Sequence, residues 1–61
     1  MSNKAKIGTV IYTNETQRVV LTFWNDDSID FSETGDVNEE TLLALASADG
    51  ANVEGWNLEY A

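Results

Sequence analysis

Cysteine and histidine are both absent from this chain of 61 residues. A domain of this size buries only about 60% of the surface that its unfolded chain exposes, and small domains commonly depend on disulfides, metal ions or partner subunits. Disulfides are excluded here, and so are the thiolate and imidazole ligands of most zinc sites. The chain must therefore rely on one packed core or on association. We expect a single domain over residues 1–61, with a loose start at residues 1–4.

Three segments rich in β-branched and aromatic residues occupy the first half of the chain. They predict strands over residues 6–13, 18–25 and 29–32. Residues 14–17 are polar and short enough for a hairpin loop. The sequence Asn-Asp-Asp-Ser at residues 25–28 is typical of a turn, because these side chains bond the local backbone. The three strands should form an antiparallel meander.

Alternation along these strands predicts which side chains are buried, because successive side chains of a strand point to opposite faces. In the second strand an entirely apolar set should face the core: Val19, Leu21 and Phe23. The other set is mixed and should face the opposite side: Val20, Thr22 and Trp24. In the third strand, Ile29 and Phe31 alternate with polar residues, and we expect them to be buried.

A helix is indicated after residue 37. Asn38 is a good N-cap, and Glu39 and Glu40 follow in the first turn, where the helix dipole favours negative charge. Asp36 is an alternative cap, with Glu39 three residues further on as in a capping box. The helix should run to residue 48 or 49 and stop at Gly50, in the C′ position that favours a left-handed backbone.

The helix and a last strand complete the predicted fold. Leu42 and Leu45 share one helix face and should pack on the sheet face that carries Leu21, whereas Leu43 points elsewhere. Val37 and Leu42 have the spacing of a hydrophobic staple. Residues 53–60 read as the fourth strand. We therefore predict an α+β fold of βββαβ order, a small antiparallel sheet with one helix packed on one face.

Composition excludes several kinds of chemistry. Without histidine or cysteine there is no serine–histidine triad, thiol nucleophile or histidine base, and we predict neither catalytic nor metal-binding nor cofactor-binding residues. The net charge of −8 disfavours direct binding of nucleic acid and of anionic membranes. No segment approaches the roughly 20 apolar residues of a membrane helix, and no signal peptide is evident, so we expect a cytoplasmic protein.

Charge is unevenly distributed along the chain. Residues 26–40 contain seven acidic residues and no base, whereas all three bases lie within the first 18 residues. Turn formation, helix capping and solubility each explain some of these acids. They also suit a binding surface for a basic partner protein, in which carboxylates could stand in for nucleic-acid phosphates. On this hypothesis the protein is a small inhibitor or modulator, and its partner-binding residues are Asp26, Asp27, Asp30, Glu33 and Asp36.

Three aromatic residues are candidates for an interface: Tyr12, Trp24 and Trp56. If Trp24 and Tyr12 lie opposite the core, they form an apolar patch with Val10 and Val20, through which a homodimer could assemble. The alternative function is then a small homo-oligomer that binds a metabolite or nucleotide between subunits. In that case the aromatic residues stack on the ligand, and Lys4, Lys6 and Arg18 meet its anionic group. Addition of a partner's strand to an exposed sheet edge is a third possibility.

Overall fold

The computed structural model describes residues 4–61 and has the predicted order of elements. The elements are β1 (Lys6–Thr13), β2 (Arg18–Trp24), β3 (Ile29–Thr34), α1 (Glu39–Ser47) and β4 (Asn57–Tyr60). The four strands form one antiparallel sheet in the order β3-β2-β1-β4. The predicted α+β fold is thereby confirmed. Of the segment expected to be loose, residues 1–3 lie outside the described part of the chain.

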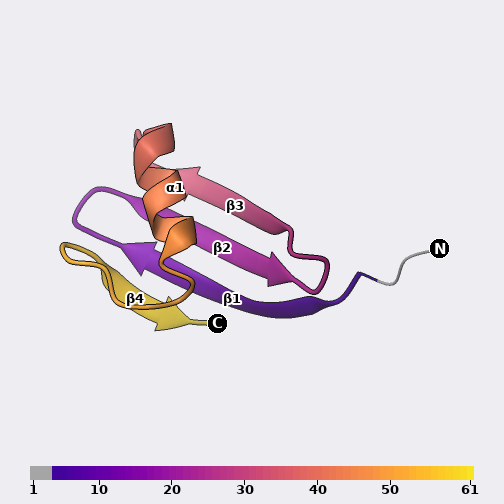
Figure 1. Cartoon of the computed structure of the whole chain (residues 1–61). Helices are drawn as coiled ribbons and strands as arrows, with labels where there is room; N and C mark the ends of the chain where they lie inside the picture. Colours follow the sequence, from indigo (N-terminus) through magenta and orange to yellow (C-terminus); the bar gives the residue numbers. More distant parts are fainter. Residues whose placement is uncertain (1–3) are drawn as a thin grey trace.

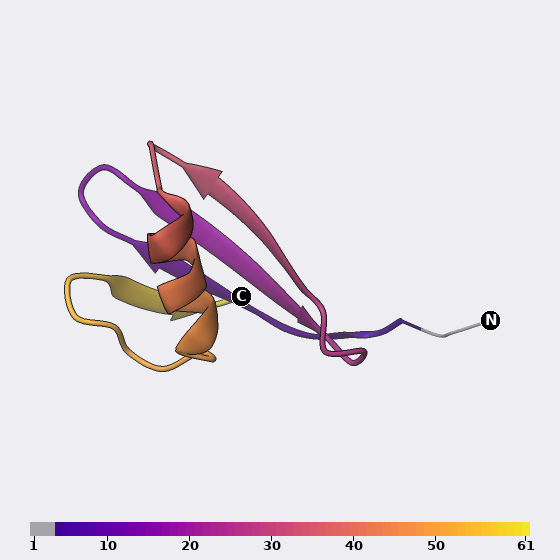
Figure 2. The same ribbon diagram turned by 45° about the horizontal axis from the view of Figure 1, so that its top comes forward.

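The molecule has two layers, because α1 packs on one face of the sheet and crosses the strands (Figures 1 and 2). We call this face of the sheet the helix face and the other the open face. Side chains from both layers form the core, and partly buried hydrophobic residues join it, namely Phe23 of β2 and others from the last third of the chain. The buried core residues are Val10, Tyr12, Val19, Leu21, Val37, Leu42 and Leu45.

The helix begins where the sequence predicts. The Asn38 side chain accepts a hydrogen bond of 2.8 Å from the backbone N–H of Thr41, which confirms Asn38 as the N-cap. Leu42 and Leu45 are buried and Leu43 is 60% exposed, so the predicted core side of α1 is also confirmed.

The end of the helix differs slightly from the prediction. The C-cap is Ala48, which places Asp49, and not Gly50, at C′. Asp49 and Gly50 both have left-handed backbone angles, with φ of 51° and 84°. Aspartate is among the few residues that tolerate this conformation, and two left-handed residues in succession turn the chain away from the helix toward β4.

The length of the β1–β2 loop decides which face each β1 side chain occupies. Thr13 pairs with Arg18, and the register then pairs Tyr12 with Val19 and Val10 with Leu21. Directly opposite residues of an antiparallel pair share a face. From Gly8 onward, the even-numbered residues of β1 therefore share a face with the apolar odd-numbered set of β2. This is why Tyr12 is fully buried under the helix.

The third strand corrects the prediction that Ile29 and Phe31 are buried. Both lie on the helix face, opposite Phe23 and Leu21 respectively, yet they are 37% and 56% exposed. β3 is an edge strand, and all six of its residues are exposed. The alternation predicted the correct face, but the helix does not extend over this edge of the sheet.

The fourth strand is shorter than predicted. Residues 53–56 form a turn closed by a hydrogen bond of 3.1 Å from the N–H of Trp56 to the carbonyl of Val53, and Gly55 has a φ of 88°. β4 then pairs with β1, with Leu58 opposite Tyr12 and Tyr60 opposite Val10. Within residues 4–61, no helix has the length and apolar character needed to cross a membrane.

Candidate functional site

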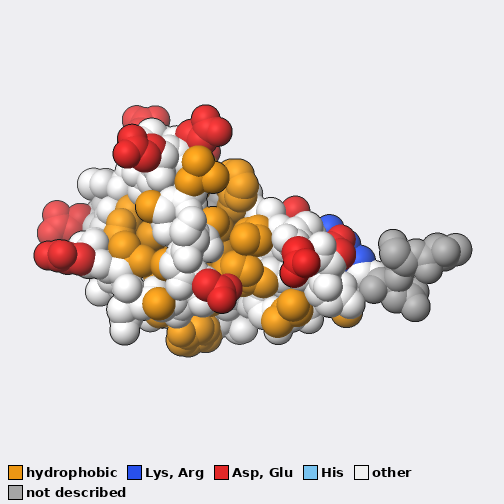
Figure 3. Space-filling model, in the orientation of Figure 1, with side chains coloured by type: hydrophobic (Ala, Val, Ile, Leu, Met, Phe, Trp, Pro, Cys, Tyr) orange, Lys and Arg blue, Asp and Glu red, His pale blue; other side chains and the backbone are white. Residues whose placement is uncertain are grey.

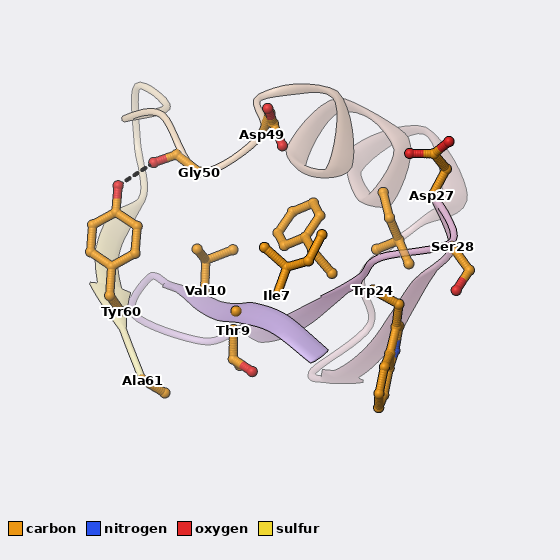
Figure 4. A pocket seen from close by; sticks show the side chains of 13 residues that line it. Ile7, Thr9, Val10, Trp24, Asp27, Ser28, Asp49, Gly50, Tyr60 and Ala61 are labelled. Atoms are coloured by element: carbon orange, nitrogen blue, oxygen red, sulfur yellow. Dashed lines mark hydrogen bonds between the residues drawn. The ribbon is translucent and has the colours of Figure 1, made fainter. Parts of the chain in front are cut away.

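An open groove of about 600 Å³ lies on the helix face beside the C-terminal end of α1. Its walls come from the start of β1, the β2–β3 hairpin, the residues that follow α1, and the end of β4 (Figure 4). Ligand pockets commonly have volumes of about 300–1,000 Å³. The groove therefore has room for one or two large side chains of a partner.

The lining of the groove is mainly apolar. Val10, Ile7 and Tyr60 point into it, whereas Thr9, Trp24 and Ala61 point to the open face (Figure 4). The remaining apolar side chains of the lining come from the β2–β3 hairpin: Phe23 and Ile29. Ile7 and Tyr60 are 70% and 71% exposed. Large apolar side chains are thus accessible to a partner at this site.

A β-bulge directs Ile7 into the groove. Lys6 pairs with Trp24 and Gly8 pairs with Phe23, so Ile7 is an extra residue without an opposite partner. A regular strand would place Ile7 on the opposite face from Gly8. The bulge interrupts that alternation, and Ile7 points to the same side as Val10 (Figure 4).

Two carboxylates border the apolar lining. Asp27 belongs to the β2–β3 turn and Asp49 to the end of α1, and both residues line the groove (Figure 4). Both have left-handed backbone angles, φ 67° and φ 51°, which the turn and the helix terminus require. Figure 3 shows the same arrangement on the surface, where acidic side chains flank the hydrophobic area beside the helix.

A hydrogen bond connects β4, which forms one wall of the groove, to the backbone that follows the helix. The Tyr60 hydroxyl donates a hydrogen bond of 2.5 Å to the carbonyl of Gly50. On the core side, the Tyr12 hydroxyl donates one of 2.7 Å to the carbonyl of Ala51. Burial raises the pKa of Tyr12 above its usual value. Two successive carbonyls of the α1–β4 connection are therefore held by tyrosines, which positions Asp49 at the rim of the groove.

The five acidic residues predicted as a partner-binding patch are all exposed, but they do not share one face. They are distributed along the β3 edge from one end to the other. Asp26 and Asp27 lie in the turn before β3, and Asp36 lies in the connection after it. Glu33 pairs with Val19 on the helix face, whereas Asp30 pairs with Thr22 on the open face. Only Asp27 among them lines the groove.

Asp26 has a local structural role. It accepts hydrogen bonds from the hydroxyl and the backbone N–H of Ser28, and these bonds lower the pKa of its carboxyl group. The side chain thus stabilises the turn that carries Asp27.

The three candidate aromatic residues do not form the predicted patch. Tyr12 is fully buried and Val10 is 5% exposed, both on the helix face, so neither lies beside Trp24 on the open face. Trp56 is half-buried and packs against the core. A stacking site made of Tyr12, Trp24 and Trp56 is therefore excluded in this fold.

Trp24 is the centre of a separate cluster on the open face. Its indole N–H donates a hydrogen bond of 2.9 Å to a carboxylate oxygen of Asp30. The ammonium of Lys4 lies 4.8 Å from the centre of the Trp24 ring. Register and alternation place Lys6 and Arg18 on the same face. All three bases of the chain thus lie on the side opposite the groove.

Sequence reasoning missed three of the groove residues that matter most: Ile7, Asp49 and Tyr60. The bulge that exposes Ile7 has no clear sequence signal. Asp49 preceded the expected stop at Gly50, and nothing marked it as the border of a groove. Tyr60 was recognised as a strand residue, but its position opposite Val10 depends on the pairing of β4 with β1.

In the part of the chain that the structure describes, residues 4–61, no group of three or more acidic side chains is arranged to hold a metal ion. Comparison with known proteins identifies no relative: no protein-family model matches the sequence, and neither curated proteins nor solved structures match it significantly. The function must therefore be inferred from the groove and its charges.

Proposed function

We propose that this protein is a non-catalytic binding protein that inhibits or modulates a partner by docking on a basic surface of that partner. The observation that carries the proposal is the apolar groove bordered by Asp27 and Asp49, on the face that lacks the three bases. A cationic segment with one large apolar side chain complements it, because the apolar side chain fills the groove while its charged neighbours meet the carboxylates.

The spacing of the acids favours a basic protein segment over close imitation of nucleic acid. Asp27, Asp30, Glu33 and Asp36 recur at every third position. Within β3, at about 3.3 Å per residue, Asp30 and Glu33 are separated by about 10 Å along the strand, whereas phosphates of one DNA strand recur about every 3.4 Å of helix axis. Asp30 and Glu33 also lie on opposite faces of the sheet.

A peptide titration tests the proposal. The probe is an acetylated and amidated nonapeptide that alternates lysine with leucine, and isothermal calorimetry measures its affinity. We expect binding that weakens as salt is raised, because exposed charges are screened. Two matched peptides separate the contributions: serine replaces leucine in one, and glutamate replaces lysine in the other. Both should bind at least about tenfold more weakly. The serine peptide loses leucine burial, which contributes about 1.5–3 kcal/mol for one leucine, and the glutamate peptide brings like charges against the carboxylates.

Protein variants locate the site. The double variant Asp27→Asn/Asp49→Asn keeps side chains that tolerate the left-handed backbone and removes both carboxylates of the groove. The control, Glu15→Gln/Glu54→Gln, makes the same change in net charge at positions outside the groove. At about 0.2–1 kcal/mol per exposed charge, the groove variant should bind several-fold more weakly than the control. Equal weakening by both variants, or binding of the glutamate peptide, would refute the proposal.

A further inference from the structure

β3 is the longer of the two edge strands. β3 spans six residues and β4 four, and the two strands terminate the sheet on either side. An edge strand carries backbone N–H and C=O groups that no neighbouring strand satisfies, and such an edge can pair with a strand of another chain.

The hairpin geometry identifies which backbone groups face outward. The N–H of Trp24 bonds to the carbonyl of Ser28, and the N–H of Asp27 bonds to the carbonyl of Trp24. Hydrogen-bonded and non-hydrogen-bonded pairs alternate in an antiparallel ladder. Asp30, Ser32 and Thr34 therefore bond to β2 across an uninterrupted register. The outward-facing backbone groups belong to Ile29, Phe31 and Glu33.

The side chains of these outward-facing residues lie on the helix face, because they pair with Phe23, Leu21 and Val19. In an added antiparallel strand, the residues that bond to Ile29 and Phe31 would place their side chains beside these two exposed apolar groups. Ile29 also lines the groove. The intervening residues would lie on the open face, near Asp30. An alternating apolar and polar segment fits this edge.

The acidic charge along β3 favours a basic segment as the added strand. Acidic residues lie at both ends of β3 and within it, from Asp26 to Asp36. A second copy of this chain, which also has a net charge of −8, would bring acidic edge against acidic edge, and like charges directly opposite are destabilising. A basic segment would instead be attracted.

We propose that a basic, extended segment of the partner adds to β3 as a fifth, antiparallel strand, with alternate apolar residues on the helix face. This inference rests on the proposed function and specifies the conformation of the bound segment. It differs from groove docking alone in requiring backbone hydrogen bonds to Ile29, Phe31 and Glu33.

N-methylated versions of the lysine–leucine peptide test this directly. An N-methyl group removes one backbone donor and sterically blocks that edge of the peptide. The leucines should lie on the helix face and bond to β3, so N-methylation of three leucines should weaken binding by about tenfold or more, since each lost hydrogen bond costs about 0.5–1.5 kcal/mol. N-methylation of three lysines, whose amides point away from β3, should leave the affinity within about threefold.

Amide hydrogen exchange gives an independent readout on the intact protein. Binding of the unmodified peptide should slow exchange at Ile29, Phe31 and Glu33 by about tenfold, with a smaller change at Asp30 and Ser32, which already bond to β2. Equal affinity of the two methylated peptides, together with unchanged exchange at these three amides, would overturn strand addition. The proposed function would survive that result, whereas failure of the unmodified peptide to bind would refute the proposed function itself.

Discussion

The two halves of the helix face are built from the same strands with the same alternation, but they differ in burial. Beneath α1, Tyr12, Val19 and Leu21 are completely buried. The uncovered half comprises the strand ends toward the β2–β3 turn and the outer edge along β3, where Ile7, Ile29 and Phe31 are 37–70% exposed. Large hydrophobic side chains thus form the core in one half and the accessible surface in the other.

The lengths of the helix and of the strands explain this difference in burial. The helix has nine residues and is therefore about 14 Å long and about 10–12 Å wide. β1 has eight residues, which corresponds to about 26 Å. A helix that crosses the strands covers only part of that length (Figures 1 and 2). The uncovered half is a consequence of one short helix on a longer sheet. The groove lies beside the helix, where the helix no longer covers the sheet.

The largest effect should come from the covered half. Leu45 is 1% exposed, and replacing a buried leucine by alanine costs about 2–5 kcal/mol. A domain of 61 residues has a stability of about 3–9 kcal/mol, so Leu45→Ala should leave much of the protein unfolded at 37 °C. Thermal and urea melts measure this. Leu43→Ala is the control on the exposed side of α1. A greater loss for Leu43→Ala would contradict the orientation of the helix described above.

A smaller effect should follow substitution in the uncovered half. Phe31 lies directly opposite Leu21 on the same face, yet it is 56% exposed. Replacing a phenylalanine in a core by alanine costs about 3–5 kcal/mol, whereas Phe31→Ala removes mainly one cross-strand contact, of about 0.2–1 kcal/mol. Urea denaturation of Phe31→Ala and of Leu21→Ala compares the loss of stability at an uncovered and at a covered residue of the same cross-strand pair. If both variants lose the same stability, the distinction between covered and uncovered halves is wrong.

The smallest effect concerns pH and the turn at the end of the uncovered half. Hydrogen bonds from Ser28 lower the pKa of Asp26 in the folded protein below the unfolded value of about 3.9. The resulting stabilisation is present above about pH 4 and is lost as the pH falls through the lowered pKa. Asp26→Asn lacks this titration and should lose slightly less stability between pH 6 and pH 2 than the unmodified protein. Urea midpoints at both pH values measure the difference, and equal losses would contradict the assignment.

Local patterns predicted most of the fold from the sequence. Alternation in β2, the Asn38 cap and the spacing of Leu42 and Leu45 each depend on neighbouring residues, so they could be read without the tertiary structure. The predicted patch of Tyr12 and Trp24 was wrong because it required the relative register of two strands. That register follows from the hairpin pairing of Thr13 with Arg18, and a shift of one residue exchanges the two faces.

The sequence by itself determined that the protein has one small core, one capped helix, three successive strands and a strongly acidic second half. These properties arise from side-chain type and from spacing along the chain. Only the tertiary structure decided which apolar residues remain accessible, because burial depends on how far α1 extends over the sheet. It also decided that Asp27 and Asp49, 22 positions apart in the sequence, border one groove, since chain folding alone brings the β2–β3 turn and the end of the helix together.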